Sequence, residues 1–354
     1  MQAVIDQLAD TIRAAAANKT PLCIRGGGSK DFYGGSLRGE LLGVSDYRGI
    51  VEYEPTELVI TARAGTPLSE IETTLRERGQ MLAFEPPHFG AGATVGGCIA
   101  AGLSGPRRAY AGAVRDYVLG VRMLDGNGSD LRFGGQVMKN VAGFDVSRLM
   151  AGSLGTLGLI LEVSLKVLPL PVAEATLHFE KSAADAIATI NEWAGQALPV
   201  SATALNSGIL RVRLSGASAA VEAAVEKLGG QLVEPIQAAT FWSGIREHAD
   251  PFFSTALPLW RLSVKSTTPP AALAGTQLIE WGGALRWLAS DADPSTVRDA
   301  ARSAGGHATL FRGADKSSGA FQPLAPALMA IHHNLKRAFD PAGIFNAGRL
   351  YESL

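Results

Sequence analysis

Cysteine is scarce in this chain, and its scarcity excludes several kinds of site. The 354 residues include only two cysteines, Cys23 and Cys98, which stand far apart and form no CxxC pair. Iron–sulfur clusters and structural zinc ions need clustered cysteines, so we expect this chain to hold neither. A disulfide framework is excluded for the same reason, and this composition favours the reducing cytoplasm.

Charge of one sign and long apolar runs are also missing. The 32 basic and 33 acidic residues give a net charge of -1 without a basic stripe, so nucleic acid is not an expected partner. The apolar stretches are short and broken by glycine, which is too little to span a bilayer. The first residues contain acids and lack the basic head and apolar run of a signal peptide. We therefore expect a soluble protein.

Glycine and apolar residues are abundant, and their distribution divides the chain into three parts. Hydrophobic residues make up 47% and glycine 41 of the 354 positions, which is typical of a globular enzyme with room for two domains. Residues 1–170 alternate helices with short β segments and include a hairpin around the DGNG turn at 125–128. Residues 171–315 follow roughly the order β-α-β-α and then β-β-α-β, which two packed ferredoxin-like halves would give. Residues 316–354 predict a helix, a turn and a tail. The predicted fold class is α+β.

Two glycine-rich segments are candidates for binding an anionic cofactor. Arg25-Gly26-Gly27-Gly28-Ser29 follows a predicted strand, and three glycines let several N–H groups approach one anion such as a pyrophosphate. Alone this is a weak signal, because a glycine turn is as often only a turn. Residues 86–105, PPHFGAGATVGGCIAAGLSG, are nearly uncharged and could lie flat against a large cofactor.

A third segment, KNVAGFDVSRLMAGSLGTLGLI at 139–160, completes a pattern in which the order of motifs is specific. In this order the three segments resemble the FAD-binding domain of the vanillyl-alcohol-oxidase/p-cresol-methylhydroxylase family. The resemblance covers about residues 1–170 and returns in FDPAGIFNAGRL at 339–350. The chain is similar in particular to flavin-linked D-2-hydroxy-acid dehydrogenases. Through the phrase KNVAGFDVSRL it also resembles the short flavin subunits of bacterial glycolate-oxidising complexes. This resemblance implies a two-subdomain FAD-binding domain at 1–170, an α+β cap at 171–315, and a tail that returns to the first domain.

The resemblance also implies which residues bind FAD. Residues 25–29 would form the first pyrophosphate loop, residues 94–105 the second, and Asn346 would approach the isoalloxazine ring. The implied cofactor-binding residues are Arg25, Gly26, Gly27, Gly28, Ser29, Thr94, Gly96, Gly97, Ser104, Gly105, Gly112, Arg115, Asp116, Gly158, Ile160 and Asn346. Covalent members of the family often carry a flavin-linking histidine where this chain has Ser29, so we expect non-covalent FAD.

The sequence departs from the family at several positions. The family's TNAGG is Ala101-Gly102-Leu103-Ser104-Gly105 here, and the glutamate of GSEGT is Leu154. The histidine set that binds a metal in the cap of the longer relatives is missing, so no metal is expected. His88 lies in the second glycine-rich segment and could contact the flavin ring or the substrate, although a plain loop histidine is the commoner case. His248 and His307 have no evident carboxylate partner, and we identify no catalytic residue.

Oxidation of a 2-hydroxy acid needs a cation for the carboxylate and a group that takes up the hydroxyl proton. Seven basic residues could supply the cation, and no sequence feature selects among them: Arg107, Arg108, Lys139, Arg211, Arg213, Arg261 and Lys265. The tryptophans of the cap, at 242, 260, 281 and 287, are by default core residues.

The expected function is that of an FAD-binding subunit in a complex that oxidises glycolate, and possibly D-lactate. By resemblance, its partners would be a larger flavin subunit and an iron–sulfur subunit that passes electrons towards the membrane quinone pool, so membrane contact would be indirect. Two alternatives remain open at this point. The chain could be a flavin relay or structural subunit whose partner performs the oxidation, or a free-standing FAD-dependent 2-hydroxy-acid dehydrogenase.

Overall fold

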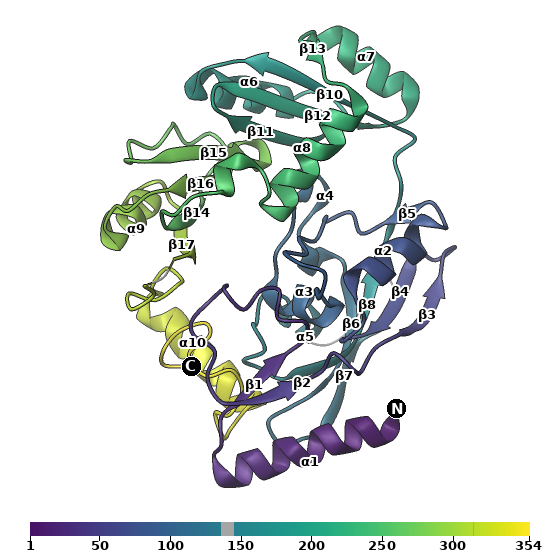
Figure 1. The fold of residues 1–354 in the computed structure, drawn as a ribbon, viewed down its shortest axis with the longest axis vertical. Coiled ribbons are helices and arrows are strands. Elements are labelled where there is room, and N and C mark those ends of the chain that lie inside the picture. The colour runs from purple at the N-terminus through teal and green to yellow at the C-terminus, as the bar shows by residue number, and fades with distance from the viewer. Residues whose placement is uncertain (136–144, 314) are drawn as a thin grey trace.

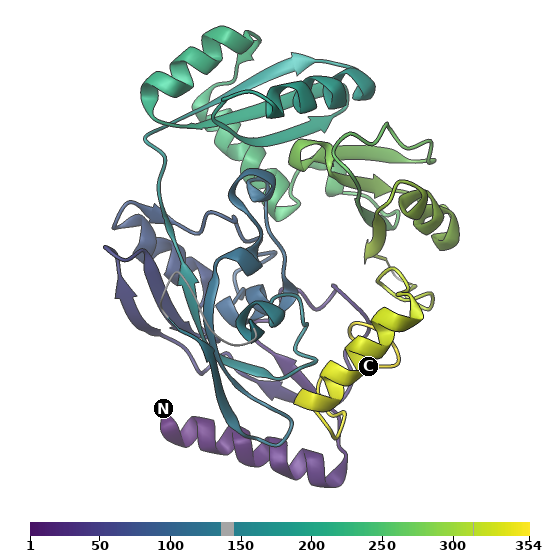
Figure 2. The same cartoon turned by 180° about the vertical axis from the view of Figure 1, so that it is seen from behind.

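The computed structural model describes residues 1–135, 145–313 and 315–354, which form two bodies stacked along the long axis of the molecule (Figure 1). The lower body contains both termini and is built around the first 170 residues. The upper body is an eight-stranded sheet with helices, drawn in teal and green. The chain crosses between the bodies twice, once near residue 171 and once after β17, as both views show (Figures 1 and 2).

The lower body contains two sheets with separate apolar cores. An antiparallel sheet has the order β3-β4-β8-β6-β7, with bounds Ile50–Glu54, Val59–Arg63, Leu159–Lys166, Val118–Leu124 and Asp130–Gly134. β6 and β7 form the predicted hairpin. The strands β1 (Leu22–Arg25) and β2 (Glu40–Gly43) pair in parallel. The helix α1 (Gln2–Asn18) buries Ile5, Leu8 and Ile12 against them, and these three residues form one face of the helix.

Short helices cover the other side of the five-stranded sheet. They are α2 (Leu68–Arg76), α3 (Val95–Ala101), α4 (Arg108–Ala111) and α5 (Val146–Leu149), and a two-stranded ribbon joins β5 (Gln80–Met81) to β9 (Leu168–Pro169). Pro67 is the N-cap of α2, and no side chain among the described residues caps this helix. Thr66 and Ser69 are residue types that often cap helices, but the hydroxyl of Thr66 instead accepts from the N–H of Gly49 at 2.9 Å.

The upper body is one antiparallel sheet made of two ferredoxin-like halves. The first half is β10 (Ala173–Glu180), α6 (Ala183–Ala194), β11 (Val200–Asn206), β12 (Ile209–Gly216), α7 (Ser218–Leu228) and β13 (Gln231–Leu232). The second is β14 (Leu259–Ser263), β15 (Thr276–Glu280), β16 (Leu285–Ala289), α9 (Pro294–Ser303) and β17 (His307–Arg312). The sheet order β13-β10-β12-β11-β15-β16-β14-β17 gives each half the same internal order, and the halves meet where β11 pairs with β15.

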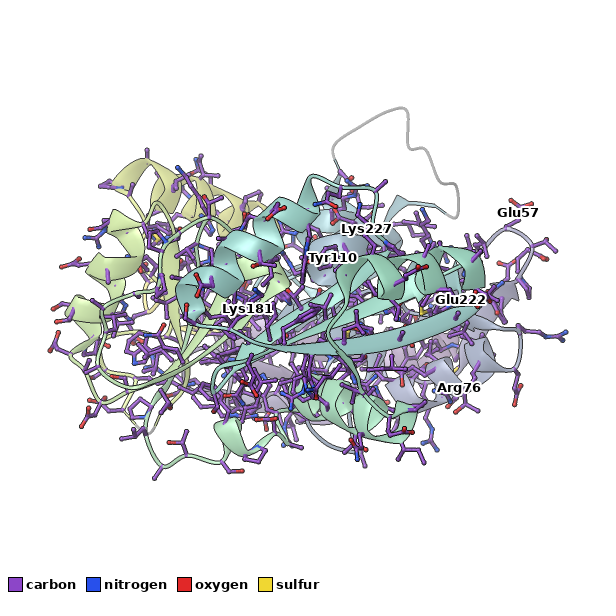
Figure 3. All side chains as sticks on the ribbon, turned by 90° about the horizontal axis from the view of Figure 1, so that it is seen from above. Glu57, Arg76, Tyr110, Lys181, Glu222 and Lys227 are labelled. Atoms are coloured by element: carbon purple, nitrogen blue, oxygen red, sulfur yellow. The ribbon has the colours of Figure 1, made fainter. Side chains whose placement is uncertain are left out.

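The two halves differ in which faces their helices cover. In the first, α6 and α7 pack on one face, where Val221 and Ala224 are buried while Glu222 and Lys227 lie at the outer surface (Figure 3). The helix α8 (Pro235–Glu247), which the sequence did not predict, packs Trp242 on the opposite face. In the second half α9 covers one face. Residues 264–275 connect β14 to β15 there, in the position that the helix α6 has between β10 and β11 in the first half. The other face of that half turns towards the lower body.

A buried ion-pair cluster joins the two bodies. Glu85 of the lower body accepts from the guanidinium of Arg213 on β12 at 3.0 Å and from the N–H of Arg107 at 2.9 Å. Burial alone would raise the pKa of Glu85, but the two arginines outweigh burial and hold its pKa below the usual value. Arg107 also pairs with Glu174 of β10. Glu174 is exposed, but Glu85, Arg107 and Arg213 are largely buried, so these three groups fix how the cap sits on the first body.

The last part of the chain returns to the first body. The helix α10 (Pro326–Phe339) lies beside β1, and the residues after it reach the edge of the parallel pair, where Phe345 forms a parallel bridge with Leu22 (Figure 1). The tail that the sequence predicted to return to the first body therefore does so.

Candidate cofactor site

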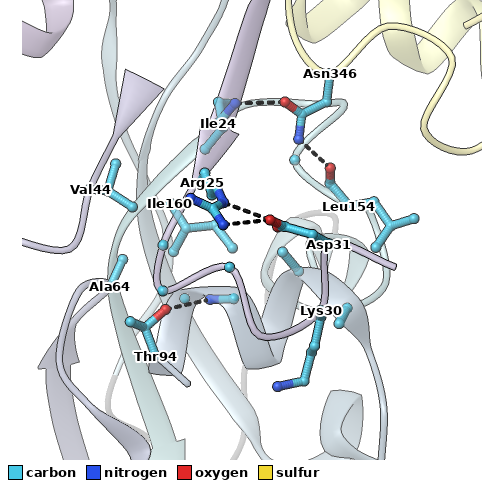
Figure 4. A pocket seen from close by; sticks show the side chains of 18 of the residues that line it. Ile24, Arg25, Lys30, Asp31, Val44, Ala64, Thr94, Leu154, Ile160 and Asn346 are labelled. Carbon is cyan, nitrogen blue, oxygen red and sulfur yellow. Dashed lines mark hydrogen bonds and ion pairs between the residues drawn. The ribbon is translucent and has the colours of Figure 1, made fainter. Parts of the chain in front are cut away.

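Two glycine-rich loops lie in direct contact at the centre of the first body. A Cβ atom on Gly27 would overlap the carbonyl oxygen of Gly92, and one on Gly26 would overlap the hydroxyl of Thr94. The two loops can therefore meet at this distance only because both positions are glycine. With residues of β1, β8 and the tail they line a pocket, shown in Figure 4, which we call the glycine cradle.

The first loop presents main-chain donors to the pocket. In the described part of the chain, no protein acceptor faces the N–H groups of residues 26–29. The loop is closed by its own side chains, because Arg25 binds Asp31 through Nε at 2.7 Å and through a terminal nitrogen at 2.6 Å (Figure 4). Gly28 has a φ of +74°, which places the turn in the region that glycine adopts without strain. Successive unpaired N–H groups in such a turn form an anion-binding concavity.

The second loop contributes the start of α3. Thr94 is its N-cap, and the hydroxyl of Thr94 accepts from the N–H of Gly97 at 3.3 Å. A Cβ on Gly96 would lie 2.6 Å from the Cβ of Ala64 on the adjoining segment, so Gly96 is required by packing. Apolar side chains from both sheets, among them Val44, Ala64 and Ile160, complete the wall of the pocket.

The tail of the chain supports the cradle from behind. The side chain of Asn346 accepts from the N–H of Ile24 at 2.7 Å and donates to the carbonyl of Leu154 at 2.6 Å, so it ties β1 to the segment before β8 (Figure 4). Arg349 donates to the carbonyls of Asp31, Tyr33 and Gly35 and thereby fixes the chain that follows the first loop.

A buried ion pair holds the tail in this position. The ammonium of Lys336 on α10 donates to Asp340 and to the carbonyl of Phe345, both at 2.7 Å, and to the carbonyl of Thr156 at 2.9 Å. Asp340 in turn accepts from the N–H groups of Ile344 and Phe345. Burial lowers the pKa of Lys336 although Asp340 opposes that shift.

Most of the predicted FAD-binding residues line this one pocket, although they come from four separate segments. Those that line it are Arg25, Gly26, Gly27, Gly28, Ser29, Thr94, Gly96, Gly97, Gly158, Ile160 and Asn346. For Gly158 the structure supplies a packing reason as well, because a Cβ there would overlap the terminal methyl of Met123.

The remaining predicted residues lie elsewhere. Ser104 and Gly105 border a second cavity under the cap, and the hydroxyl of Ser104 accepts from the N–H of Val114 at 3.0 Å. Gly112 and Asp116 shape the turn before β6, where the carboxylate of Asp116 accepts from the N–H of Ala113. Arg115 is exposed and lines a groove beside α10. A cofactor contact for these residues stays a prediction. Lys139 and most of the phrase KNVAGFDVSRL lie outside the described residues.

Sequence reasoning missed several residues that line the cradle, and three of them are charged: Lys30, Asp31 and Arg349. The ammonium of Lys30 donates to the carbonyl of His88, and burial lowers its pKa. Arg349 stands inside the tail motif, so that motif is the one signal that could have pointed to it.

The residues present fit a dinucleotide such as FAD. Unpaired N–H groups in a loop that has no room for side chains suit a pyrophosphate, and the apolar wall suits an aromatic base. Within residues 1–135, 145–313 and 315–354 there is no cluster of three or more potential metal ligands. No helix in these same ranges is both long and apolar enough to cross a membrane.

Comparison with known proteins agrees with this geometry. A family model described as an FAD binding domain matches residues 3–134. The chain is 50% identical over 353 residues to the glycolate oxidase subunit GlcE of Escherichia coli (strain K12), covering 100% of this chain and 98% of that protein. It is 30% identical over 175 residues to the glycolate oxidase subunit GlcD of Bacillus subtilis (strain 168), covering 49% of this chain and 37% of that one. A D-lactate dehydrogenase of Anaerostipes hadrus is 28% identical over 53% of this chain and 40% of its own.

Solved structures show the fold independently. An alkyldihydroxyacetonephosphate synthase superposes with a TM-score of 0.67 at 15% identity, covering 96% of this chain and 75% of that one. The predicted α+β fold, an FAD-binding domain of the p-cresol-methylhydroxylase type with an α+β cap, is therefore confirmed. On the full-length identity and the FAD-binding domain together, this chain belongs to the family of the glycolate oxidase subunit GlcE, a family of FAD-dependent oxidoreductase subunits.

Proposed function

We propose that this chain is the FAD-binding subunit of a complex that oxidises glycolate, and also D-lactate, to the corresponding 2-oxo acid. The observation that carries the proposal is the glycine cradle, in which four segments meet around main-chain donors that have no acceptor within the described part of the protein. The substrate class comes from the names of the relatives, which are a glycolate oxidase subunit and a D-lactate dehydrogenase.

The cradle residues have distinct proposed roles towards FAD. The N–H groups of residues 26–29 would donate to the pyrophosphate, and Thr94, Gly96 and Gly97 would shape the opposite wall. Gly158 and Ile160 would face the adenine side, and Asn346 would hold β1 and the Leu154 segment in place behind the cofactor. When bound, the flavin supplies a two-electron acceptor. Ser29 stands where covalent relatives carry a histidine, so we propose that FAD is bound non-covalently.

Electrons would have to leave the flavin through partner subunits. The two cysteines of this chain are buried, and burial raises the pKa of Cys98 to about 12, so neither is suited to bind an iron–sulfur cluster. We propose an iron–sulfur subunit and a larger flavin subunit as partners, in a cytoplasmic complex that contacts the membrane only through them. The relatives include a second glycolate oxidase subunit, GlcD, and this supports the proposal of a larger partner subunit.

We also propose 1–170, 171–315 and 316–354 as domain boundaries.

An anaerobic absorbance titration of the purified chain tests this proposal. We expect the chain to show a flavin spectrum, after addition of FAD if necessary, and glycolate or D-lactate to bleach it. A spectrum that stays oxidised would place the oxidation in a partner and leave this chain a flavin relay. A chain that takes up no FAD would contradict the proposal.

A further inference from the structure

A second cavity lies between the cap and the second glycine loop. The open face of the second half of the cap sheet forms its roof, and the segment that contains Ser104 and Gly105 forms its floor. The indole N–H of Trp281 donates to the carbonyl of Gly105 at 3.0 Å, so the sheet and the loop are in direct contact here. Other lining residues are His248, Arg261, Glu280, Trp287 and Phe311, and we call this space the cap cavity.

Arg261 differs from the buried arginines of the cap. Arg213 binds Glu85 and Ser201, Arg286 binds two carbonyls, and Arg298 binds two more. Within the described residues Arg261 forms neither a hydrogen bond nor an ion pair, although burial lowers its pKa. Its guanidinium lies 5.0 Å from the centre of the Trp281 ring and lines the cap cavity. Arg261 is half-buried, and a cation that is partly removed from water without an anionic partner has a desolvation cost that is not compensated.

Two other arginines near this cavity also have no hydrogen-bond partner among the described residues. Arg108 lies over Trp281, and Arg312 lies over Phe32 and Phe89, but neither lines the cap cavity. Both repel an additional cation and therefore favour an anion beside Arg261.

A neutral histidine stands opposite this cation. The ring of His248 stacks on Phe253 at 3.9 Å and meets the edge of Trp287 at 4.7 Å. Burial lowers the pKa of His248 well below 6.5, and Arg312 and Arg261 add to that shift. The Nδ1 atom of this ring is buried and has no hydrogen-bond partner. A neutral imidazole nitrogen without a partner can accept a hydrogen bond from a hydroxyl group.

Glu280 does not neutralise the site. Its carboxyl accepts from the indole N–H of Trp287 at 2.6 Å. Burial raises the pKa of Glu280 to about 8, even though the Trp287 bond and Arg261 oppose the shift. At neutral pH the carboxyl is therefore mostly protonated. Arg246 also lines the cavity, but its guanidinium pairs with Glu247 at 2.8 Å. Among the described residues, the cavity-lining cation without an ion pair is then Arg261, and its charge matches one monocarboxylate.

The size of the cavity limits the ligand. The cap cavity is small, with about 20 Å³ open to a water-sized sphere, and aromatic side chains form part of its wall. Its side chains must move apart to admit a ligand larger than water. Among 2-hydroxy acids, those of two or three carbons require the least rearrangement.

We propose that the cap cavity binds a small 2-hydroxy carboxylate, with Arg261 binding the carboxylate and Nδ1 of His248 accepting a hydrogen bond from the hydroxyl group. This inference rests on the proposed function, because it assigns the substrate site to the same chain as the flavin. The site is built from this chain's own residues and needs no metal ion.

Calorimetric titration of the full-length chain with glycolate tests the proposal. The FAD-free chain is titrated first, since glycolate binds there without being oxidised, and the FAD-loaded chain is titrated second. We expect saturable binding to the wild type and at least tenfold weaker binding to Arg261→Met, with unchanged flavin content. Arg261→Lys should bind with intermediate affinity, because it keeps the charge but not the paired donors.

Arg211→Met is the matched control. Arg211 lies on the cap strand β12, and its guanidinium is 4.3 Å from the centre of the Phe241 ring, but it lies outside the cap cavity. It should bind glycolate as the wild type does. Equal binding by the wild type and Arg261→Met, or equal loss in Arg211→Met, would overturn the assignment of Arg261.

The outcomes also separate this proposal from the proposed function. A wild type that takes up FAD but binds no glycolate in either form contradicts the cap site and leaves FAD binding intact. A wild type that binds glycolate but no FAD contradicts the proposed function, and the calorimetric comparison of Arg261 variants still decides the cap site.

Discussion

The glycine cradle and the cap cavity are built in opposite ways. The cradle is formed by main-chain atoms of two loops that touch because their side chains are missing, and its donors are N–H groups. The cap cavity is formed largely by side chains of the cap sheet and of the end of α8, and its polar groups include guanidinium, imidazole and carboxyl groups. A site of the first kind fails when an atom is added, whereas a site of the second kind fails when a group is removed.

The change that should break the cradle most completely is Gly27→Ala. The new methyl group would overlap the carbonyl of Gly92, so the two loops must separate. We expect loss of flavin from the purified protein, measured as the ratio of visible to ultraviolet absorbance, with glycolate binding in the cap cavity retained.

Gly43→Ala is the control for that experiment. Gly43 ends the neighbouring strand β2, and a Cβ there has nothing within 4 Å. Stoichiometric FAD in Gly27→Ala, or equal loss in Gly43→Ala, would show that contact between the loops is not what the cradle requires.

The next effect should come from the ion pair that holds the tail. Lys336→Met leaves the carboxylate of Asp340 buried without its cation, which costs on the order of 3–5 kcal/mol. We expect the free energy of unfolding to fall by about that amount in urea titrations, and FAD to bind more weakly because Asn346 is no longer held. The neighbouring exposed residue supplies the control, since Arg337→Met should change neither quantity. An unaltered midpoint in Lys336→Met would argue against the role given to the tail.

The smallest effect, and the one that sharpens the description of the cap cavity, concerns Glu280. Its pKa in the folded chain is raised from 4.5 to about 8, so the unfolded chain binds fewer protons between these values and stability falls as the pH rises through that window. Glu280→Gln keeps an acceptor for Trp287 without the ionisation. We expect the variant to gain stability over the wild type as the pH rises from 5 to 8, by roughly 3 kcal/mol at pH 7.

Glu85→Gln should behave in the opposite sense. The pKa of Glu85 is lowered, so its contribution to stability is present above the unfolded value and is lost as the pH falls. This substitution should therefore destabilise the chain at neutral pH, with a cost that shrinks in acid. If the two glutamine variants showed the same pH dependence in thermal melts, the contrast between the two buried carboxyls would be wrong.

The same difference in construction explains which parts could be predicted from the sequence. The cradle was predictable because glycine is itself the signal, and Gly26, Gly27, Gly96 and Gly97 stand in consecutive runs. The cap cavity was not, since Arg261 and Arg211 both stand in apolar strand patterns. Only the fold shows that the first lines a cavity and the second does not.

Three elements of the cap could not be predicted from the sequence, for related reasons. β11 is a central strand whose small residues, such as Ala202, Thr203 and Ala204, are buried on both faces, so no alternation marks it. In α8 the apolar residue Ile236 is 82% exposed, so apolar residues are not confined to one face and the helical periodicity is weak. β15 ends in the buried Glu280, which no pattern rule places in a core.

The dependence of the cradle on the tail has a consequence for biosynthesis. The bond from Ile24 to Asn346 joins residues that are 322 positions apart, and Arg349 reaches back 318 positions to Asp31. At the usual speed of translation, roughly 15–65 s separate the emergence of these partners from the ribosome. During that interval the first loop has its own Arg25–Asp31 pair but neither Asn346 nor Arg349, while the cap is still being made. Cofactor loading is therefore a late event in the life of the nascent chain, and FAD supply acts on the finished polypeptide.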